Sequence, residues 1–201
     1  MKKGIVLLFS MVVMVSCGDG TKENKADEQS TVTSDWVEVK PQEIDVNAVK
    51  MFADDWMVLS AGNEQEMNMM TIAWGGLGQL WGKPVVTVYV STSRYTYKFM
   101  EENDYFTVTS FNEEYRDTLQ YLGTVSGRDE DKVKGSGLTT EFTELGNPIY
   151  KEANLAIECK KIYSHQFERD KLPLKQRQWY DESKTGIHVM YVGEIVHVWK
   201  K

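Results

Sequence analysis

The stretch KPVVTVYVSTSRYTYKFMEEND, residues 83–104, joins a predicted strand to a predicted helix. Residues 83–91 are mostly β-branched or apolar, a pattern typical of a strand that is buried on both faces. Ser93 is a good helix N-cap, so residues 94–96 would form the first helical turn. That turn has the cation Arg94 where the helix dipole favours acids, whereas the acids stand at the far end. We expect an external anion here, held by free backbone N–H groups and by Ser93, Arg94 and Thr96.

Strand patterns recur on both sides of this stretch, at 55–62, 68–76, 105–111, 154–167 and 187–200. A second helix is predicted at 112–123, with Asn112 as its cap, Leu119 and Leu122 on its buried face, and Gly123 at its end. Residues 127–137 are predicted to form a short charged helix or turn. Many closely spaced strands with few helices predict a mainly β fold, a β-barrel with peripheral helices.

The chain begins with two lysines, an apolar run over 5–15, and then Ser16 and Cys17. The run has the length of a signal-peptide core, because a membrane-spanning helix needs about 20 apolar residues. A small residue directly before a cysteine resembles the lipobox of bacterial lipoproteins, in which the cysteine becomes the lipidated first residue. We therefore predict a lipoprotein signal peptide over 1–16 and an exported protein, anchored to the cell envelope through Cys17. The alternative is an ordinary cleaved signal in which Cys17 is incidental.

Residues 17–40 are predicted to be a flexible tether, because the part from Gly18 to Thr33 is polar and almost free of large apolar side chains. The remaining residues, 41–201, suit one globular domain. The whole chain has 23 basic and 30 acidic side chains, which gives a formal net charge of −7. A surface this acidic argues against nucleic acid as a partner.

The chain has two cysteines and three histidines. If Cys17 is acylated, Cys159 has no partner within the chain and a disulfide framework is excluded. Cys159 alternates with Leu155 and Ile157, so we expect a buried strand thiol. The histidines are scattered and the cysteine pattern does not fit zinc, so the sequence predicts no metal site.

Three separate stretches would suit one ligand. In the first, residues 71–74 end a predicted strand, and the glycines at 75, 76 and 78 would let the backbone approach a flat ligand; an ordinary hairpin turn is the alternative. The second stretch is the anion site at 91–96. In the third, Thr124, Ser126 and Arg128 would add donors to the same anion, with a solvated charged turn as the alternative.

In their order along the chain, these stretches resemble a known family. The patterns are N-x-M-T-x-x-W-G-G, W-x-K-P, V-Y-V-x-x-S-R-Y-T, G-T-x-S-G-R-D-x-D-K and H-x-M-Y-x-G-E-I, and they extend from about Trp56 to Val198. They are similar to those of flavin reductase-like proteins of the flavoredoxin type. The resemblance implies an FMN-binding split β-barrel and a homodimer.

The resemblance also implies a role for individual residues. The backbone along the flavin ring would be that of Thr71, Ile72, Ala73 and Trp74. The phosphate and ribityl chain of FMN would be held by Ser91, Ser93, Arg94, Tyr95 and Thr96, with Thr124, Ser126 and Arg128 close by. His188, the candidate catalytic residue, would lie on the nicotinamide or substrate side of the ring. The alternative is that His188 has only a structural role in its strand.

The implied function is that of a membrane-anchored flavoprotein oxidoreductase. Bound FMN would pass electrons between a reductant such as NAD(P)H and a small acceptor or another flavin. An export signal would take the chain to a compartment with little nicotinamide, which leaves the reductant open. The alternatives are a non-enzymatic FMN-binding electron carrier that serves a membrane partner, and a lipid-anchored domain whose flavin site has decayed.

Overall fold

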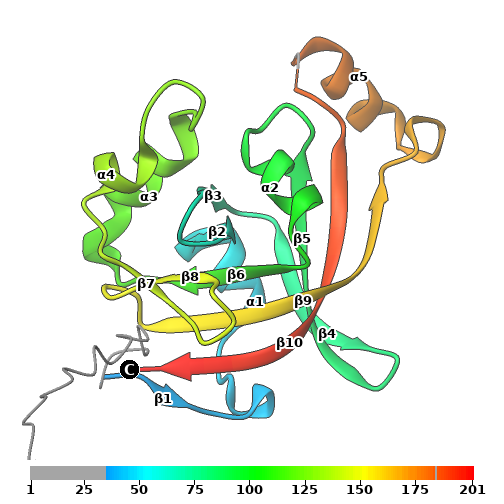
Figure 1. Cartoon of the computed structure of the whole chain (residues 1–201). Coiled ribbons are helices and arrows are strands. Elements are labelled where there is room, and N and C mark those ends of the chain that lie inside the picture. The colour runs from blue at the N-terminus through cyan, green and yellow to red at the C-terminus, as the bar shows by residue number, and fades with distance from the viewer. Residues whose placement is uncertain (1–34, 184) are drawn as a thin grey trace, which may run out of the picture.

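A computed structural model of the chain describes residues 35–183 and 185–201, so the predicted signal peptide, Cys17 and most of the predicted tether lie outside the described residues. The main element is a curled antiparallel sheet (Figure 1). From edge to edge its strands are β3 (Met67–Ile72), β2 (Met57–Gly62), β6 (Tyr105–Ser110), β9 (Leu155–Gln166), β10 (His188–Lys200), β5 (Lys83–Ser91) and β4 (Gly75–Leu80). An eighth strand, β1 (Val37–Glu38), pairs with the end of β10.

The two edge strands, β3 and β4, are consecutive in the sequence and are joined only by Ala73 and Trp74. Three Cα steps of about 3.8 Å keep the Cα atoms of Ile72 and Gly75 within roughly 11 Å of each other. The sheet must therefore curl until its edges nearly meet at this link. The result is a barrel that stays open along one line, here named the β3–β4 seam.

Short helices surround the barrel, as the sequence predicts (Figure 1). They are η1 (Pro41–Glu43), α1 (Ala48–Lys50), the π-helix η2 (Met51–Asp55), α2 (Thr96–Glu102), η3 (Glu113–Tyr115), α3 (Arg116–Thr124), α4 (Lys132–Ser136), η4 (Arg169–Lys171) and α5 (Leu174–Glu182). A separate hairpin consists of β7 (Thr140–Phe142) and β8 (Pro148–Tyr150). The prediction of a mainly β fold with peripheral helices is confirmed. In the described part of the chain, every helix is too short or too polar to cross a membrane.

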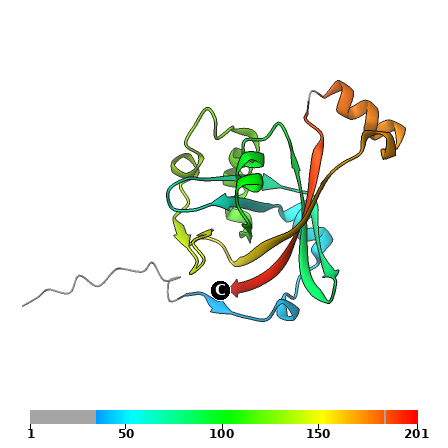
Figure 2. The ribbon, with the colours of Figure 1, turned by 45° about the vertical axis from the view of Figure 1, so that its right-hand side comes forward.

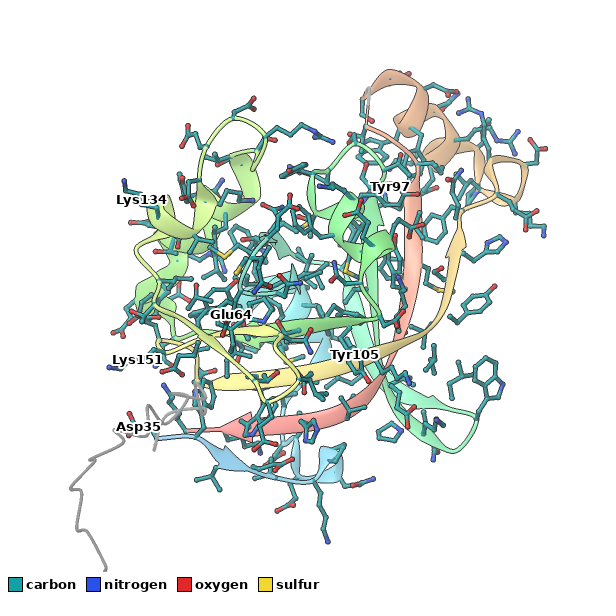
Figure 3. The ribbon with its side chains drawn as sticks, viewed as in Figure 1. Asp35, Glu64, Tyr97, Tyr105, Lys134 and Lys151 are labelled. Carbon is teal, nitrogen blue, oxygen red and sulfur yellow. The ribbon has the colours of Figure 1, made fainter. Side chains whose placement is uncertain are left out.

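Side chains fill the space that the sheet encloses (Figure 3). This main core includes Met57, Leu59, Phe106, Ile157 and Tyr191, all fully buried. A second cluster includes Val58, Met69, Leu119, Leu122 and Tyr150, and it joins α3 to β2 and β3. Cys159 is a fully buried thiol on β9, as predicted, and burial raises its pKa.

Several element predictions need correction, among them the cap Asn112, whose side chain makes no capping hydrogen bond. The helix predicted to end at Gly123 continues one residue further, to Thr124, and a Cβ at position 123 would make only an ordinary contact, 3.4 Å from Cβ of Thr71 on β3. The strand at 83–91 is buried on both faces only in part, because Thr87 and Tyr89 are half-buried between fully buried valines. These two side chains lie on the face of β5 that is turned away from the main core.

The folded domain begins before residue 41. Trp36 is 9% exposed and its Nε1 donates to Glu141, while Val37 pairs with Lys200. Residues 35–40, predicted as the end of the tether, therefore belong to the domain. The difference has a simple physical reason, since Trp36 is the first large apolar side chain that follows the polar stretch ending at Thr33.

The helix α5 stands away from the barrel, at the ends of β9 and β10 (Figures 1 and 2). None of its residues is buried. It is attached to η4 by an ion pair between Arg169 and Asp181, and Arg177 donates to the backbone carbonyls of Asp170 and Leu172. The sequence did not predict α5, because a helix with no buried face lacks the apolar periodicity by which helices are found.

Candidate functional site

The chain leaves β5 at Ser91 through a tight turn and enters α2 at Thr96. In this turn the N–H of Arg94 donates to the carbonyl of Ser91 at 3.0 Å. The hydroxyl of Ser93 pairs with that of Ser91 at 2.9 Å and does not cap the helix. The predicted helix start at Ser93 is therefore wrong, because the chain first closes two i→i+3 turns, in which the N–H of Arg94 donates to Ser91 and that of Tyr97 to Arg94. Arg94 precedes the helix and does not lie in its first turn.

This turn forms one wall of a cavity of about 300 Å³, here named the cationic cavity. The loop 125–128 after α3 forms another wall. The lining residues are Asn68, Met70, Ser93, Arg94, Tyr95, Thr96, Val125, Ser126, Gly127, Arg128, Lys132 and Thr185. Among these described residues are three cations and no carboxylate, although the whole chain is acidic. The charge of the cavity suits an anion.

Each of the three cations is positioned by a backbone carbonyl and not by an acid. Arg94 donates to Gly123 at 3.1 Å, Arg128 to Ser93 at 3.0 Å, and Lys132 to Leu122. None of the three forms an ion pair with a residue that the structure describes. Their positive charges are therefore available to a ligand.

Lys132 is the most buried of these cations, with 5% of its surface exposed. Burial and, to a smaller extent, the charge of Arg94 lower the pKa of its ammonium group to about 8. A buried cation that lacks a counterion is unfavourable. An anion in the cavity would offset both effects.

The walls of the cationic cavity approach each other closely because residue 127 is glycine. A Cβ at this position would stand 2.2 Å from Oδ1 of Asn68 and 2.9 Å from the ring of Tyr95. Asn68 also donates through Nδ2 to Oγ1 of Thr96 at 2.7 Å, which ties β3 to the start of α2. The cavity is thus formed by fixed side-chain contacts between segments far apart in the sequence.

A second cavity, of about 330 Å³ and here named the aromatic cavity, lies at the β3–β4 seam. Its lining residues are Met70, Thr71, Ile72, Ala73, Trp74, Tyr89, Ser91, Arg94, Trp179, Thr185 and His188. Trp74 is 52% exposed and Trp179 43%, with 6.3 Å between their ring centroids. Because Met70, Arg94 and Thr185 line both cavities, the two adjoin, and the joint site has a cationic end and an aromatic end.

His188, the first residue of β10, is 8% exposed and lies at the aromatic end. Its Nδ1 is 2.7 Å from the hydroxyl of Tyr180 on α5, and its ring centroid is 5.0 Å from that of Trp74. Burial and, secondarily, the charge of Arg94 lower the pKa of His188 to about 4, so the imidazole is neutral at pH 7. Burial also raises the pKa of Tyr180, which keeps its proton.

The structure gathers most of the predicted site residues at these two cavities. The cationic cavity has Ser93, Arg94, Tyr95, Thr96, Ser126 and Arg128, and the aromatic cavity has Thr71, Ile72, Ala73, Trp74, Ser91 and His188. Thr124 lines neither cavity. Its hydroxyl donates instead to the carbonyls of Gln120 and Tyr121, at 3.0 and 3.1 Å within its own helix.

The glycines predicted to approach a flat ligand have other surroundings. Gly75 begins β4, and a Cβ there would stand 2.3 Å from the ring of Phe52, so packing explains this glycine. A Cβ at Gly76 or Gly78 would meet no described atom within 4 Å apart from those of its chain neighbours, and neither glycine lines a cavity. The hairpin turn lies further on, where Trp81 and Gly82 have positive φ angles of 52° and 74°.

Sequence reasoning missed several residues at the site. Asn68 and Lys132 stand inside quoted patterns, N-x-M-T and G-T-x-S-G-R-D-x-D-K, and their place there could have identified them. Trp179, Tyr180 and Thr185 come from a segment without any recognisable pattern, so only the fold reveals them. The described residues contain no cluster of three or more histidine, cysteine or acidic side chains that could hold a metal ion.

Comparisons with known proteins bear on this geometry. The family model described as "Flavin reductase like domain" matches residues 49–201. A protein of Archaeoglobus fulgidus, described only as uncharacterized, is 27% identical over 135 residues, or 67% of this chain and 66% of that protein. Flavoredoxin from Methanosarcina acetivorans aligns with a TM-score of 0.58 and 25% identity, over 73% of this chain and 68% of that chain.

A third similar protein supports the fold. An FMN-binding domain of a flavin reductases-like enzyme from Shewanella baltica aligns with a TM-score of 0.60 and 17% identity, over 84% of this chain and 78% of that chain. The predicted fold, that of the flavin reductase-like split barrels, is confirmed. The chain spans 66% of the length of the curated relative from Archaeoglobus fulgidus. The matched range 49–201 includes every described residue that lines the two cavities, and the chain belongs to the flavin reductase like domain family.

Proposed function

We propose that the protein binds FMN, with the phosphate in the cationic cavity and the isoalloxazine ring in the aromatic cavity. One observation carries this proposal: the two cavities adjoin at Arg94, and polarity changes along the joint site as it changes along FMN. The family of the chain and its likeness to a flavoredoxin support the same ligand.

The residues of the cationic cavity fit a phosphate. Arg94 and Arg128 offer charge-assisted hydrogen bonds, the strongest kind available to a phosphate oxygen. Lys132 adds a third charge whose burial is otherwise not compensated. Hydroxyl groups within the same lining are those of Ser93, Tyr95, Thr96, Ser126 and Thr185.

The residues of the aromatic cavity fit a flat ring. The backbone over 71–74 would lie along it, Trp74 and His188 would orient it, and Trp179 would limit the access of water. Bound FMN supplies the transfer of electrons, and the protein supplies orientation, local charge and access. We therefore propose an oxidoreductase of the flavin reductase type, in which His188 contacts the reacting ring or its substrate.

We propose NAD(P)H as the candidate reductant and a small molecule or another flavin as the acceptor. A non-enzymatic FMN-binding electron carrier is the second candidate function. The half-exposed rings of Trp74 and Trp179 favour it, because an accessible ring edge suits electron exchange with a protein partner. Oxidation of NAD(P)H by the FMN-loaded protein would identify the reductase. Bound FMN that is reduced by chemical reductants but not by NAD(P)H would identify the carrier.

Three further proposals concern the state of the protein in the cell. The short apolar run, the small residue before Cys17 and the polar stretch after it support export and lipid attachment through Cys17. Resemblance to the family supports a homodimer. The acidic charge of the chain supports partners other than nucleic acid.

The central test is a comparison of FMN with riboflavin, which has the same ring and no phosphate. Flavin fluorescence titrations on the purified protein should give an affinity for FMN at least about tenfold higher, because hydrogen bonds to charged groups contribute roughly 1.5–3 kcal/mol each. Equal affinities would contradict the phosphate position. Failure to bind either flavin would overturn the proposed function.

A further inference from the structure

The helix α5 buries none of its residues, so it adds little to the core. Its aromatic side chains nevertheless reach His188: the ring centroid of Trp179 is 6.4 Å from that of His188, and the centroid of Tyr180 is 5.7 Å away. The direct polar contact is the 2.7 Å hydrogen bond between the hydroxyl of Tyr180 and Nδ1 of His188. Through these contacts α5 holds one imidazole, that of His188, in place.

The direction of this hydrogen bond follows from the two groups. A neutral imidazole has one N–H and one bare nitrogen, and the phenol has a single proton to donate. The phenol oxygen of Tyr180 also faces the backbone N–H of His188, which can only donate. Nδ1 of His188 is the acceptor within reach of the phenol proton among the described residues, and Nε2 of His188 has no described partner. Donation from the phenol to a bare Nδ1 satisfies both groups with one bond, whereas the reverse direction leaves the phenol proton without a described acceptor.

We propose that Tyr180 is a positioning residue for His188: its hydroxyl donates to Nδ1 and fixes the imidazole as the neutral tautomer that carries its proton on Nε2, and this Nε2–H is a hydrogen-bond donor to a ligand in the aromatic cavity. The tautomer of a histidine is set in general by the hydrogen bond that its other nitrogen makes. Here that bond comes from a helix outside the barrel.

A neutral N–H donor selects the chemistry of the ligand. The described lining of the aromatic cavity has aromatic rings, one arginine and no carboxylate. It suits a flat aromatic ligand with an acceptor atom at its edge, such as a carbonyl oxygen or an unprotonated ring nitrogen. The opposite tautomer, with its proton on Nδ1, would place the lone pair of Nε2 against that acceptor. That this N–H donates to a flavin ring, or to a substrate stacked against the ring, rests on the proposed function. The tautomer itself does not rest on it.

The first experiment measures the tautomer in the flavin-free protein, by ¹⁵N NMR of the histidine side chains at pH 7. Wild type should show His188 with an unprotonated Nδ1 and a protonated Nε2. Tyr180→Phe should shift the Nδ1 and Nε2 signals toward each other, because the two tautomers then exchange. A wild-type spectrum with the proton on Nδ1 would overturn the proposal even if the variant did not fold.

The matched control is Tyr163→Phe. Tyr163 packs flat against His165, with 6.3 Å between ring centroids, but its hydroxyl makes no hydrogen bond to a described residue. Loss of this hydroxyl should leave the His188 signals in place. Equal shifts of the His188 signals in Tyr163→Phe and Tyr180→Phe would show a general effect of losing a tyrosine hydroxyl, and would contradict the proposal.

The second experiment measures FMN affinity in Tyr180→Phe, His188→Ala and the double variant. A lost neutral hydrogen bond should weaken FMN and riboflavin alike, by about two- to tenfold. Since Tyr180 acts through His188, the double variant should lose no more than His188→Ala alone. Additive losses would mean that Tyr180 acts independently and would overturn its positioning role. If neither the wild type nor any variant binds flavin, the proposed function fails. The tautomer measured by NMR does not depend on that result.

Discussion

Arg94 and Lys132 face the same cavity with no described carboxylate between them, and the charge of Arg94 helps to lower the pKa of Lys132 to about 8. The same guanidinium also lowers the pKa of His188 in the adjoining cavity. Arg94 therefore acts electrostatically on both ends of the site. An anion beside Arg94 would reduce its effect on both groups, which links ligand binding to proton binding.

Arg94→Ala should weaken FMN binding by about one to two orders of magnitude, because a charge-assisted hydrogen bond contributes roughly 1.5–3 kcal/mol. Riboflavin affinity should hardly change. Arg116→Ala is the matched control, since Arg116 also donates to backbone carbonyls but lines neither cavity. Fluorescence titrations check this prediction, and an equal loss for FMN and riboflavin would show that Arg94 shapes the site without binding phosphate.

Binding of FMN near pH 8 should be accompanied by proton uptake. Lys132 has a pKa of about 8 in the free protein, so part of the population is neutral there. A phosphate beside it would raise the pKa again and make the ammonium bind a proton. Calorimetric titrations in two buffers with different ionisation enthalpies measure the uptake. Riboflavin and the Lys132→Met variant should show none; uptake that persists in Lys132→Met must come from another group.

Acid should destabilise the protein in a way that depends on His188. The folded-state pKa of about 4 lies below the ordinary value of 6.5, so the unfolded chain binds this proton first. The stabilisation is complete above about pH 6.5 and is lost as pH falls toward 4, by up to about 3 kcal/mol. Urea unfolding of wild type and His188→Gln over this range should show a shallower pH dependence in the variant. Parallel curves would contradict the prediction.

Gly75→Val should lower the free energy of unfolding of the flavin-free protein by roughly 1–3 kcal/mol, because the new side chain meets the ring of Phe52. Gly76→Val is its control on the same strand and has open space, so its stability should change by less than about 1 kcal/mol. Thermal unfolding measures both. An unchanged Gly75→Val stability together with weaker flavin binding would support the alternative interpretation, in which this glycine lets the backbone approach the ring.

Cys17→Ser should move the protein from the detergent phase to the soluble fraction when it is expressed in a bacterium that lipidates exported proteins. A single acyl chain binds a bilayer only marginally, so stable attachment requires the several chains of a bacterial lipoprotein. Phase partition and mass spectrometry of the wild-type N-terminus measure the effect. An unlipidated, soluble wild type would refute the lipobox interpretation.

Long, strongly patterned segments were predictable from the sequence. The strands at 154–167 and 187–200 correspond to β9 and β10, and Cys159 is buried as its alternation with Leu155 and Ile157 indicates. The start of α2 was not predictable, because two i→i+3 backbone turns, at Ser91–Arg94 and Arg94–Tyr97, precede the helix. Such short turns leave no mark in apolar periodicity.

Residues that the fold brings together were harder to find. Gly75 leaves room for the ring of Phe52, which stands 23 positions earlier in the chain. A local sequence pattern cannot show such a contact. Tyr180 belongs to a helix without a buried face, so nothing in its own segment indicates a role. Lys132 differs from both, because it belongs to a motif that is visible in the sequence. Its burial could not be predicted from that motif.

The two-residue link at Ala73 and Trp74 also bears on self-association. A sheet with two free edges exposes unpaired backbone N–H and C=O groups to which another chain can add. Tying β3 directly to β4 turns the two edges of this sheet toward each other at one end. A longer link would let the edges separate, so the shortness that shapes the aromatic cavity also limits how far the two edges can be exposed to another chain at this end of the sheet.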